Sequence, residues 1–260
     1  MIELYILLGM AAGLLAGLLG VGGGLIIVPA LAAIFVHLQY PPEVLMHMAI
    51  ATSLATIVVT SIVSAWAHHR HGAVLWPVVA KLIPGILLGA IAGAWLAGQL
   101  PTSSLRIAFG VFEILVAIQM GLSLRPLASR HLPQHAGMTM AGGVIGAVSA
   151  LVGIGGGTLT VPFLYWCRVA MRQAVATSAA CGLPIAIAGM AAYIMLGWDV
   201  TGLPVRHLGY IDLLAWLWIA VGSILFAPLG AKLAHRLPVT ILKRIFAVLL
   251  FIIGVRMLIN

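Results

Sequence analysis

The sequence predicts an all-α polytopic membrane protein, because its composition is apolar, long apolar segments recur, and its two halves share motifs. Hydrophobic residues make up 63% of the 260 residues and charged residues only 7%, whereas about 25% of a soluble domain is charged. The mean hydropathy is +1.20, and apolar stretches long enough to span a bilayer recur along the chain. This composition excludes a soluble domain, a disordered chain and a nucleic-acid-binding protein. The lipid bilayer is the expected surrounding.

Ten apolar segments can be placed along the chain. They cover residues 4–20, 25–38, 46–66, 74–99, 104–122, 138–153, 158–167, 174–197, 209–234 and 239–259. A polar stretch that contains Arg125 and Arg130 divides the chain nearly in half. We therefore predict a transmembrane repeat at 1–122, a basic cytoplasmic linker at 123–136 and a second transmembrane repeat at 137–260.

The two halves carry the same three landmarks in the same order and at nearly the same spacing. The pairs are Gly20-Val21-Gly22-Gly23-Gly24 with Gly153-Ile154-Gly155-Gly156-Gly157, Ala51-Thr52-Ser53 with Ala176-Thr177-Ser178, and Leu100-Pro101 with Leu237-Pro238. Three landmarks in one order indicate an internal duplication. Many secondary transporters are built this way, with the substrate site where the repeats meet.

The distribution of basic residues predicts how the repeats are oriented. If each glycine-broken pair of segments, 4–38 and 138–167, crosses the membrane once, five basic residues lie on one side and six on the other. If each pair crosses zero or two times, the distribution becomes eight against three. The second arrangement obeys the positive-inside rule. It leaves an odd number of crossings per repeat, so the second repeat is inverted and both termini are non-cytoplasmic.

The second arm of each glycine-broken pair is short for a bilayer core of about 30 Å, since a helix rises about 1.5 Å per residue. These arms are residues 25–38 and 158–167. We expect two re-entrant helical hairpins that enter from opposite faces, with their glycine turns near the midplane. Each repeat then contains one hairpin and three transmembrane helices, about eight membrane segments in all. Ten full crossings are the alternative.

The glycine turns and two hydroxyl pairs are the candidate substrate site. Glycine lets a ligand approach the backbone closely, and a helix that starts after such a turn offers free N–H groups to an anion. The predicted substrate-binding residues are Gly22, Gly23, Gly24, Thr52, Ser53, Gly155, Gly156, Gly157, Thr177 and Ser178. The alternatives are that the glycines only permit close helix packing and that the hydroxyls only bond backbone carbonyls of their own helices.

Few ionisable residues fall inside the apolar segments. Lys81 could supply positive potential, and Glu113 is the one acid in the middle of a segment, so it is a candidate for charge or ion coupling. We find no catalytic motif, no metal-ligand set and no cofactor signature, so we expect no enzyme activity, no metal and no cofactor.

The doubled glycine motif, each copy ending in Val-Pro and followed by Ala-Thr-Ser, resembles the TauE/SafE sulfite exporter family, also called the DUF81 or TSUP group. Val175-Ala176-Thr177-Ser178, Gly182-Leu183-Pro184 and Ala227-Pro228-Leu229-Gly230-Ala231 add to the likeness. It extends over nearly the whole chain. The resemblance implies a multi-pass inner-membrane permease with about eight transmembrane segments, and a small sulfur-containing anion such as sulfite as substrate. It transfers no established binding residue.

Together these features predict a secondary transporter, in the exporting direction, of sulfite or another sulfur oxyanion or organosulfonate. Alternating access would place the site at the paired glycine turns. The expected location is the inner (cytoplasmic) membrane, and a homo-oligomer is compatible with the sequence. Two alternatives stay open at this point. One is an intramembrane enzyme acting on a lipid phosphate, and the other is a cation or metal transporter that uses Glu113 and His47.

Overall fold

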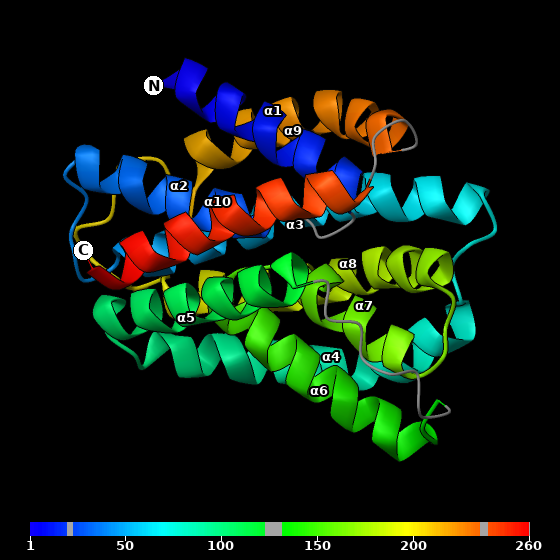
Figure 1. Ribbon diagram of the computed structural model, residues 1–260. Helices are drawn as coiled ribbons and strands as arrows, with labels where there is room; N and C mark the ends of the chain where they lie inside the picture. Colours follow the sequence, from blue (N-terminus) through cyan, green and yellow to red (C-terminus); the bar gives the residue numbers. More distant parts are fainter. Residues whose placement is uncertain (20–22, 123–131, 235–238, 260) are drawn as a thin grey trace.

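The computed structural model describes residues 1–19, 23–122, 132–234 and 239–259, which contain ten helices and a two-stranded hairpin (Figure 1). The elements are α1 (Ile2–Leu19), α2 (Gly24–His37), α3 (Leu45–Arg70), α4 (Trp76–Gly98), α5 (Thr102–Gly121), α6 (His135–Val152), α7 (Gly157–Trp166), α8 (Met171–Leu196), β1 (His207–Leu208), β2 (Ile211–Asp212), α9 (Leu213–Ala234) and α10 (Val239–Ile259). Each predicted apolar segment corresponds to one helix, so the all-α prediction is confirmed.

Several helix bounds differ from the predicted segments by up to four residues, and two of these differences affect another predicted element. α6 begins at His135, inside the predicted linker, most of which lies outside the described residues. The predicted segment 209–234 starts with β2 rather than with helix, and α9 begins only at Leu213. Gly209 takes a φ of +55° and turns the chain between β1 and β2. Strands of two residues are too short to leave a signal in hydropathy.

Six described helices are long and apolar enough to cross a membrane. They are α3, α4, α5, α6, α8 and residues 213–230 of α9. By contrast, α2 has 14 residues and α7 only 10. At about 1.5 Å per residue neither could span the hydrocarbon core.

Four helices of the first half each pack on a helix of the second half, and equivalent helices of the two halves make equivalent pairs. α1 packs on α9 as α6 packs on α4, while α3 packs on α8 and α5 on α10. A Cβ at Gly85 would collide with the carbonyl oxygen of Thr139, and one at Gly222 with that of Ile6. Gly85 and Gly222 are 137 residues apart, as are Leu100 and Leu237 of the third landmark. Ile6 and Thr139 are 133 residues apart, as are Gly20 and Gly153 of the first landmark, so the two contacts are equivalent in the two repeats. Three more contacts obey the same offsets: Gly93 on Ala147 with Gly230 on Leu14, Gly142 on Leu82 with Gly9 on Ile219, and Gly146 on Ile86 with Gly13 on Ser223.

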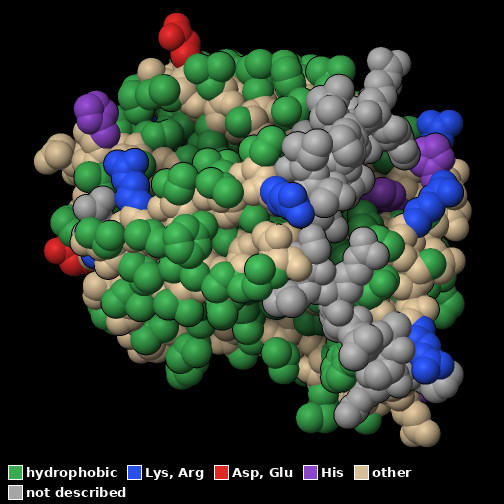
Figure 2. Space-filling view, in the orientation of Figure 1, with side chains coloured by type: hydrophobic (Ala, Val, Ile, Leu, Met, Phe, Trp, Pro, Cys, Tyr) green, Lys and Arg blue, Asp and Glu red, His purple; other side chains and the backbone are tan. Residues whose placement is uncertain are grey.

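The ends of the molecule differ in charge. Both chain termini lie at the same end of the helix bundle (Figure 1). Most Lys and Arg side chains visible in Figure 2 lie toward the opposite end. The long sides between the two ends are covered by hydrophobic side chains on the face shown (Figure 2). Basic residues at one end and an apolar belt between the ends are typical of a protein oriented in a bilayer.

The paired helices α3 and α8 are the most polar part of the buried interior. Thr52, Ser53, Thr177 and Ser178 are all buried. The glycine turns before α2 and α7 lie next to these helices, since a Cβ at Gly24 would lie 3.1 Å from Cδ1 of Ile57 and one at Gly156 would lie 3.5 Å from the nitrogen of Gly182. Hydroxyl groups and turns with unpaired backbone are tolerated at membrane depth only inside protein or beside a wet cavity. The candidate site is therefore on the inside of the bundle.

Candidate functional site

The two glycine turns contact each other. A Cβ at Gly24, the first residue of α2, would lie 2.7 Å from the carbonyl oxygen of Gly153 and 2.9 Å from the Cα of Ile154. Ser53 of α3 donates a hydrogen bond of 2.8 Å to the same Gly153 oxygen. Residues from both motifs and one predicted hydroxyl therefore meet, as the sequence predicts. Gly22 lies outside the described residues.

The left-handed backbone conformation of Gly153 ends α6 and starts the second glycine turn. Gly153 has a φ of +75°, in the left-handed region that glycine adopts without a steric penalty. The N–H groups of Gly153 and Ile154 donate to the Ser149 carbonyl oxygen at 2.9 and 3.0 Å. Any side chain at Gly153 would press on the Cα of Ile50 at 3.0 Å. A glycine here lets the chain leave α6 and start α7 in a confined space.

Both helices that follow the turns begin without a side-chain cap. Gly23 precedes α2 and Gly156 precedes α7, and neither can place a side-chain oxygen on the first turn. The first N–H groups of a helix have no partner within the helix, and the helix dipole makes this end positive. Gly155, Gly156 and Gly157 are all buried. Two uncapped helix starts inside the protein provide N–H donors suited to an anion.

The two threonines of the repeated motif have one and the same structural task. The Thr52 hydroxyl accepts a hydrogen bond of 3.0 Å from the N–H of Asp212, just before α9. The Thr177 hydroxyl accepts one of 3.1 Å from the N–H of Leu75, just before α4. Leu75 and Asp212 are themselves equivalent positions, because they are 137 residues apart, as are Leu100 and Leu237 of the third landmark. Each hydroxyl thus satisfies a backbone donor in front of a neighbouring helix and keeps its own proton to donate.

The two serines differ in their partners. Ser53 reaches across to Gly153, whereas Ser178 donates at 2.8 Å to the carbonyl of Val175 in its own helix. The second contact is the back-bonding that serine commonly makes inside helices. Only one serine of the pair therefore joins the two halves through the contacts of the described residues.

Glu113 lies away from the glycine turns, in the seam between α5 and α10. Its side chain is fully buried, and neither carboxyl oxygen has a hydrogen-bond partner among the described residues. The two helices approach closely at Gly110 and Gly254, and a Cβ at Gly254 would lie 3.2 Å from the Cβ of Glu113. Lys81 is half-buried in α4. Neither residue supplies any of the atoms nearest to a Cβ placed at Gly23, Gly24, Gly153 or Gly156.

His47 has a partner of its own. Its Nε2 lies 3.1 Å from the carbonyl oxygen of Ala97, and its ring stacks on Tyr210 with 5.2 Å between the centroids. The described residues contain no group of three or more His, Cys, Asp or Glu side chains that could hold a metal ion. His47 and Glu113 also belong to different helix pairs, α3 with α8 and α5 with α10.

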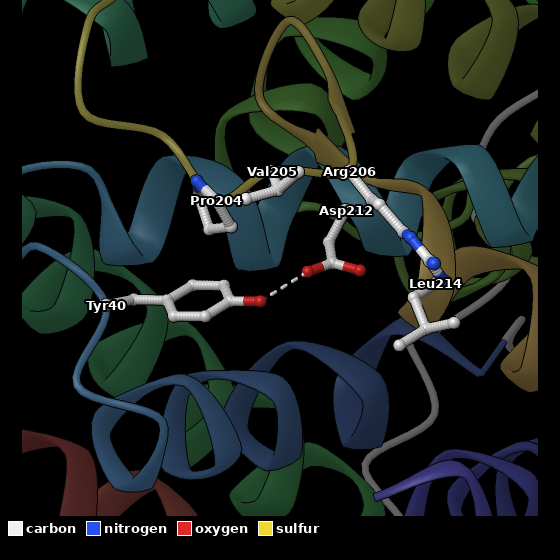
Figure 3. A pocket seen from close by; sticks show the side chains of 6 residues that line it. All are labelled: Tyr40, Pro204, Val205, Arg206, Asp212 and Leu214. Carbon is white, nitrogen blue, oxygen red and sulfur yellow. Dashed lines mark hydrogen bonds between the residues drawn. The ribbon is translucent and has the colours of Figure 1, made fainter.

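The sequence analysis missed a pocket of about 250 Å³ at the end of the molecule where β2 lies. Asp212 and Tyr40 point toward each other across it (Figure 3), and the Tyr40 hydroxyl donates a hydrogen bond of 2.6 Å to Oδ2 of Asp212. Oδ1 of Asp212 accepts from the N–H of Ala215 at 2.8 Å and so caps α9. Burial and the Asp212 hydrogen bond raise the pKa of the Tyr40 phenol, which therefore stays a donor. An aspartate near the start of the predicted apolar segment 209–234 was the only sequence signal.

Comparisons with known proteins find one family model and several related membrane transporter proteins. The family model described as "Sulfite exporter TauE/SafE" matches residues 5–257. A "Probable membrane transporter protein" of Haemophilus influenzae is 38% identical over 258 residues, which cover 98% of this chain and 97% of the relative. Probable membrane transporter proteins of Methanocaldococcus jannaschii and Bacillus subtilis are 26% and 27% identical, and each alignment covers at least 96% of both chains. No solved structure matches the chain.

Proposed function

The chain belongs to the TauE/SafE sulfite exporter family and is a multi-pass membrane transporter, not an enzyme; from this premise we propose that it exports a small sulfur-containing anion. Sulfite or another sulfur oxyanion or organosulfonate is the proposed substrate. The observation that carries the proposal is the meeting of two glycine turns beside two uncapped helix starts. Such N–H groups bind an anion without a fixed positive charge, so the substrate can be released again on the other side.

Alternating access follows from two inverted repeats around this site. In the proposed topology, α1 with α2 forms a re-entrant hairpin from the side of the termini, and α6 with α7 forms one from the cytoplasmic side. Six full crossings, α3–α5 and α8–α10, complete eight membrane segments. The short α2 and α7 and the exchange of packing contacts between the halves support this arrangement. The repeats are residues 1–122 and 137–260, joined by the basic cytoplasmic linker 123–136.

Cysteine labelling tests the topology. Single cysteines at Gly72, between α3 and α4, and at Asp199, after α8, should label from opposite sides of the inner membrane. Labelling of both from one side would contradict the inverted repeats. Gly72 is a suitable site because a Cβ there meets nothing within 4 Å.

Residues of the second motif and the hydroxyl pairs complete the proposed substrate site. Its residues are Gly22, Gly23, Gly24, Thr52, Ser53, Gly155, Gly156, Gly157, Thr177 and Ser178. The direction of transport follows from charge: the membrane potential, negative inside, favours the exit of an anion without a coupled ion. Lys81 would add positive potential from α4.

Glu113 is the proposed site for a coupling ion or proton, since an intramembrane carboxyl group without a hydrogen-bond partner is costly to keep. Glu113→Gln should then change the dependence of anion flux on the pH gradient. A variant that loses the flux of a cation while anion flux is unaffected would instead favour a cation transporter.

The substrate class is tested with the purified full chain in proteoliposomes. Efflux of sulfite, thiosulfate and sulfoacetate is measured against chloride and sodium, with a negative interior potential set by valinomycin and a potassium gradient. We expect at least one sulfur anion to leave faster than from empty liposomes, and faster still at a more negative interior. Flux of none of these sulfur anions would contradict the proposal.

A further inference from the structure

We propose that the second glycine turn is the half that recognises the anion, and that the hydroxyl groups of Ser149, Thr158 and Thr160 bind it directly. The ligand class is a small oxyanion whose oxygens accept several hydrogen bonds. This inference rests on the proposed function and names the residues that give the site its specificity. None of the three is among the residues that the sequence analysis selected.

All three hydroxyl groups are buried without a partner. Ser149 and Thr160 are 0% exposed and Thr158 is 7% exposed. None of their oxygens has a hydrogen-bond partner among the described residues. A buried hydroxyl without a partner destabilises a fold, and most buried polar groups do have one. Hydroxyls without a partner on α6 before the turn and on α7 after it indicate a place where a bound molecule supplies the partner.

The first repeat shows that the fold does not need these hydroxyls. At the offset that relates Gly20 to Gly153, Ser149 corresponds to Ala16, Thr158 to Leu25 and Thr160 to Ile27. Leu25 and Ile27 are each 1% exposed, so apolar side chains fill the equivalent positions in an equally buried setting. Packing alone would be served as well by apolar residues in the second repeat. The hydroxyls therefore point to a function of the second turn.

The hydroxyl of Thr160 lies directly at the turn. A Cβ at Gly156 would lie 3.2 Å from Oγ1 of Thr160 and 3.5 Å from the backbone nitrogen of Gly182. A Cβ at Gly182 would lie 2.9 Å from Oγ of Ser61 and 3.7 Å from the nitrogen of Gly156. Polar atoms of α3, α7 and α8 thus border two backbone positions that carry no side chain. Neither position has room for a methyl group in this conformation, since Cδ1 of Ile185 also lies 2.9 Å from a Cβ at Gly156, so a ligand reaches these polar atoms only when the helices move apart, as alternating access implies.

The polar groups around the second glycine turn are suited to an anion. The start of α7 presents N–H donors and the positive end of a helix dipole, and serine and threonine hydroxyls can donate to an oxyanion oxygen. The five acids of the chain, Glu3, Glu43, Glu113, Asp199 and Asp212, all lie outside residues 149–182. No carboxylate of these segments competes with the ligand. The proposed donors are uncharged, which is consistent with reversible binding.

The test measures sulfite binding by the purified full chain, as the rise in melting temperature with sulfite concentration, together with sulfite efflux. The variants are Thr160→Val, Thr158→Val, Ser149→Ala and the triple combination. We expect ligand-free melting temperatures equal to or above wild type, because each change removes an unpaired polar group. Sulfite affinity should fall about tenfold or more for each lost charge-assisted hydrogen bond. Thr160→Ser, which keeps the hydroxyl, should retain wild-type affinity.

Two control variants isolate the effect. Ser223→Ala removes a buried hydroxyl that donates to the Gly9 carbonyl between α9 and α1, and it should leave affinity unchanged. Ile27→Thr adds a hydroxyl to the first turn and should not raise affinity. Wild-type affinity in the triple variant, while wild-type sulfite efflux is present, would overturn this inference and leave the proposed function standing. Absence of efflux and binding for every sulfur anion in the wild type would overturn both.

Discussion

The two glycine turns share a backbone plan and differ in the side chains around it. Both follow a long apolar helix, both start a short helix without a side-chain cap, and they contact each other through Gly24 and Gly153. Around the first turn the buried side chains include Leu25 and Ile27, and at the equivalent positions of the second they are threonines. The repeated packing therefore builds the frame, while the recognition that we propose depends on the differences between the repeats.

The same contrast holds farther from the turns. The hydroxyls of Thr52 and Thr177 make equivalent contacts in the two repeats. Glu113 corresponds to Leu250 at the offset of the third landmark, and both are fully buried in the seam of α5 and α10. A buried polar group that has an apolar counterpart is therefore a candidate for a function of one repeat alone, whereas these two threonines make the same contact in both.

The largest expected effect tests the shared packing. Gly85→Ala and Gly222→Ala place a methyl group against the backbone carbonyls of Thr139 and Ile6, and backbone cannot move aside as a side chain can. Each should lower the free energy of unfolding by about 3 kcal/mol, seen as a fall in melting temperature and yield in detergent. Gly121→Ala is the control, because its Cβ meets only the Ala247 methyl at 3.5 Å. A neutral Gly222→Ala beside a severe Gly85→Ala would break the equivalence of the repeats.

Alanine substitutions in the two glycine turns should lower stability by a smaller amount, and by different amounts in the two turns. Gly24→Ala would press on the backbone of the other turn, at 2.7 Å from the Gly153 oxygen, and should cost about 2 kcal/mol. Gly156→Ala meets a movable side-chain atom first, Cδ1 of Ile185 at 2.9 Å, and should cost about 1 kcal/mol. The melting temperatures of the two variants decide the order. A Gly156→Ala variant that is less stable than Gly24→Ala would show that the second turn is the tighter one.

Ser53 and Ser178 should also differ. Ser53→Ala leaves the Gly153 carbonyl without its 2.8 Å hydrogen bond and should cost about 1.5 kcal/mol. Ser178→Ala removes a contact to the carbonyl of Val175, which α8 already uses, and should cost about 0.5 kcal/mol or less. Thermal unfolding of both variants at one detergent concentration measures the difference. Equal losses would mean that the link between the halves does not depend on Ser53.

The smallest expected difference concerns the two threonines. Thr52→Val and Thr177→Val each remove an acceptor for one backbone N–H in front of a helix. Each should cost about 1 kcal/mol, the usual value of a lost cap. Because the two contacts are equivalent, their shifts in melting temperature should agree within error. A much larger effect on one side would indicate that only one threonine has this structural task.

Hydropathy predicted the helices well, because segments such as 46–66 and 239–259 are apolar enough to be visible without tertiary information. The contact between Gly24 and Gly153 could be expected only as a meeting of repeats, since its geometry depends on how α2 and α6 pack. The task of Thr52 could not be foreseen, because its partner, Asp212, is 160 residues away in the chain. The threonines of the second turn could have been found by aligning the repeats, where Thr160 falls opposite Ile27.

The most direct test is sulfite efflux from proteoliposomes that contain the wild type or the Gly23→Leu, Gly156→Leu double variant. Leucine at both positions would cover the start of α2 and of α7. Gly121→Leu, in the last turn of α5, is the control, and size exclusion and melting temperature establish that each protein is folded. We predict efflux for the wild type and the control, and loss of efflux for a folded double variant. Wild-type efflux in that double variant would contradict a substrate site at the paired glycine turns.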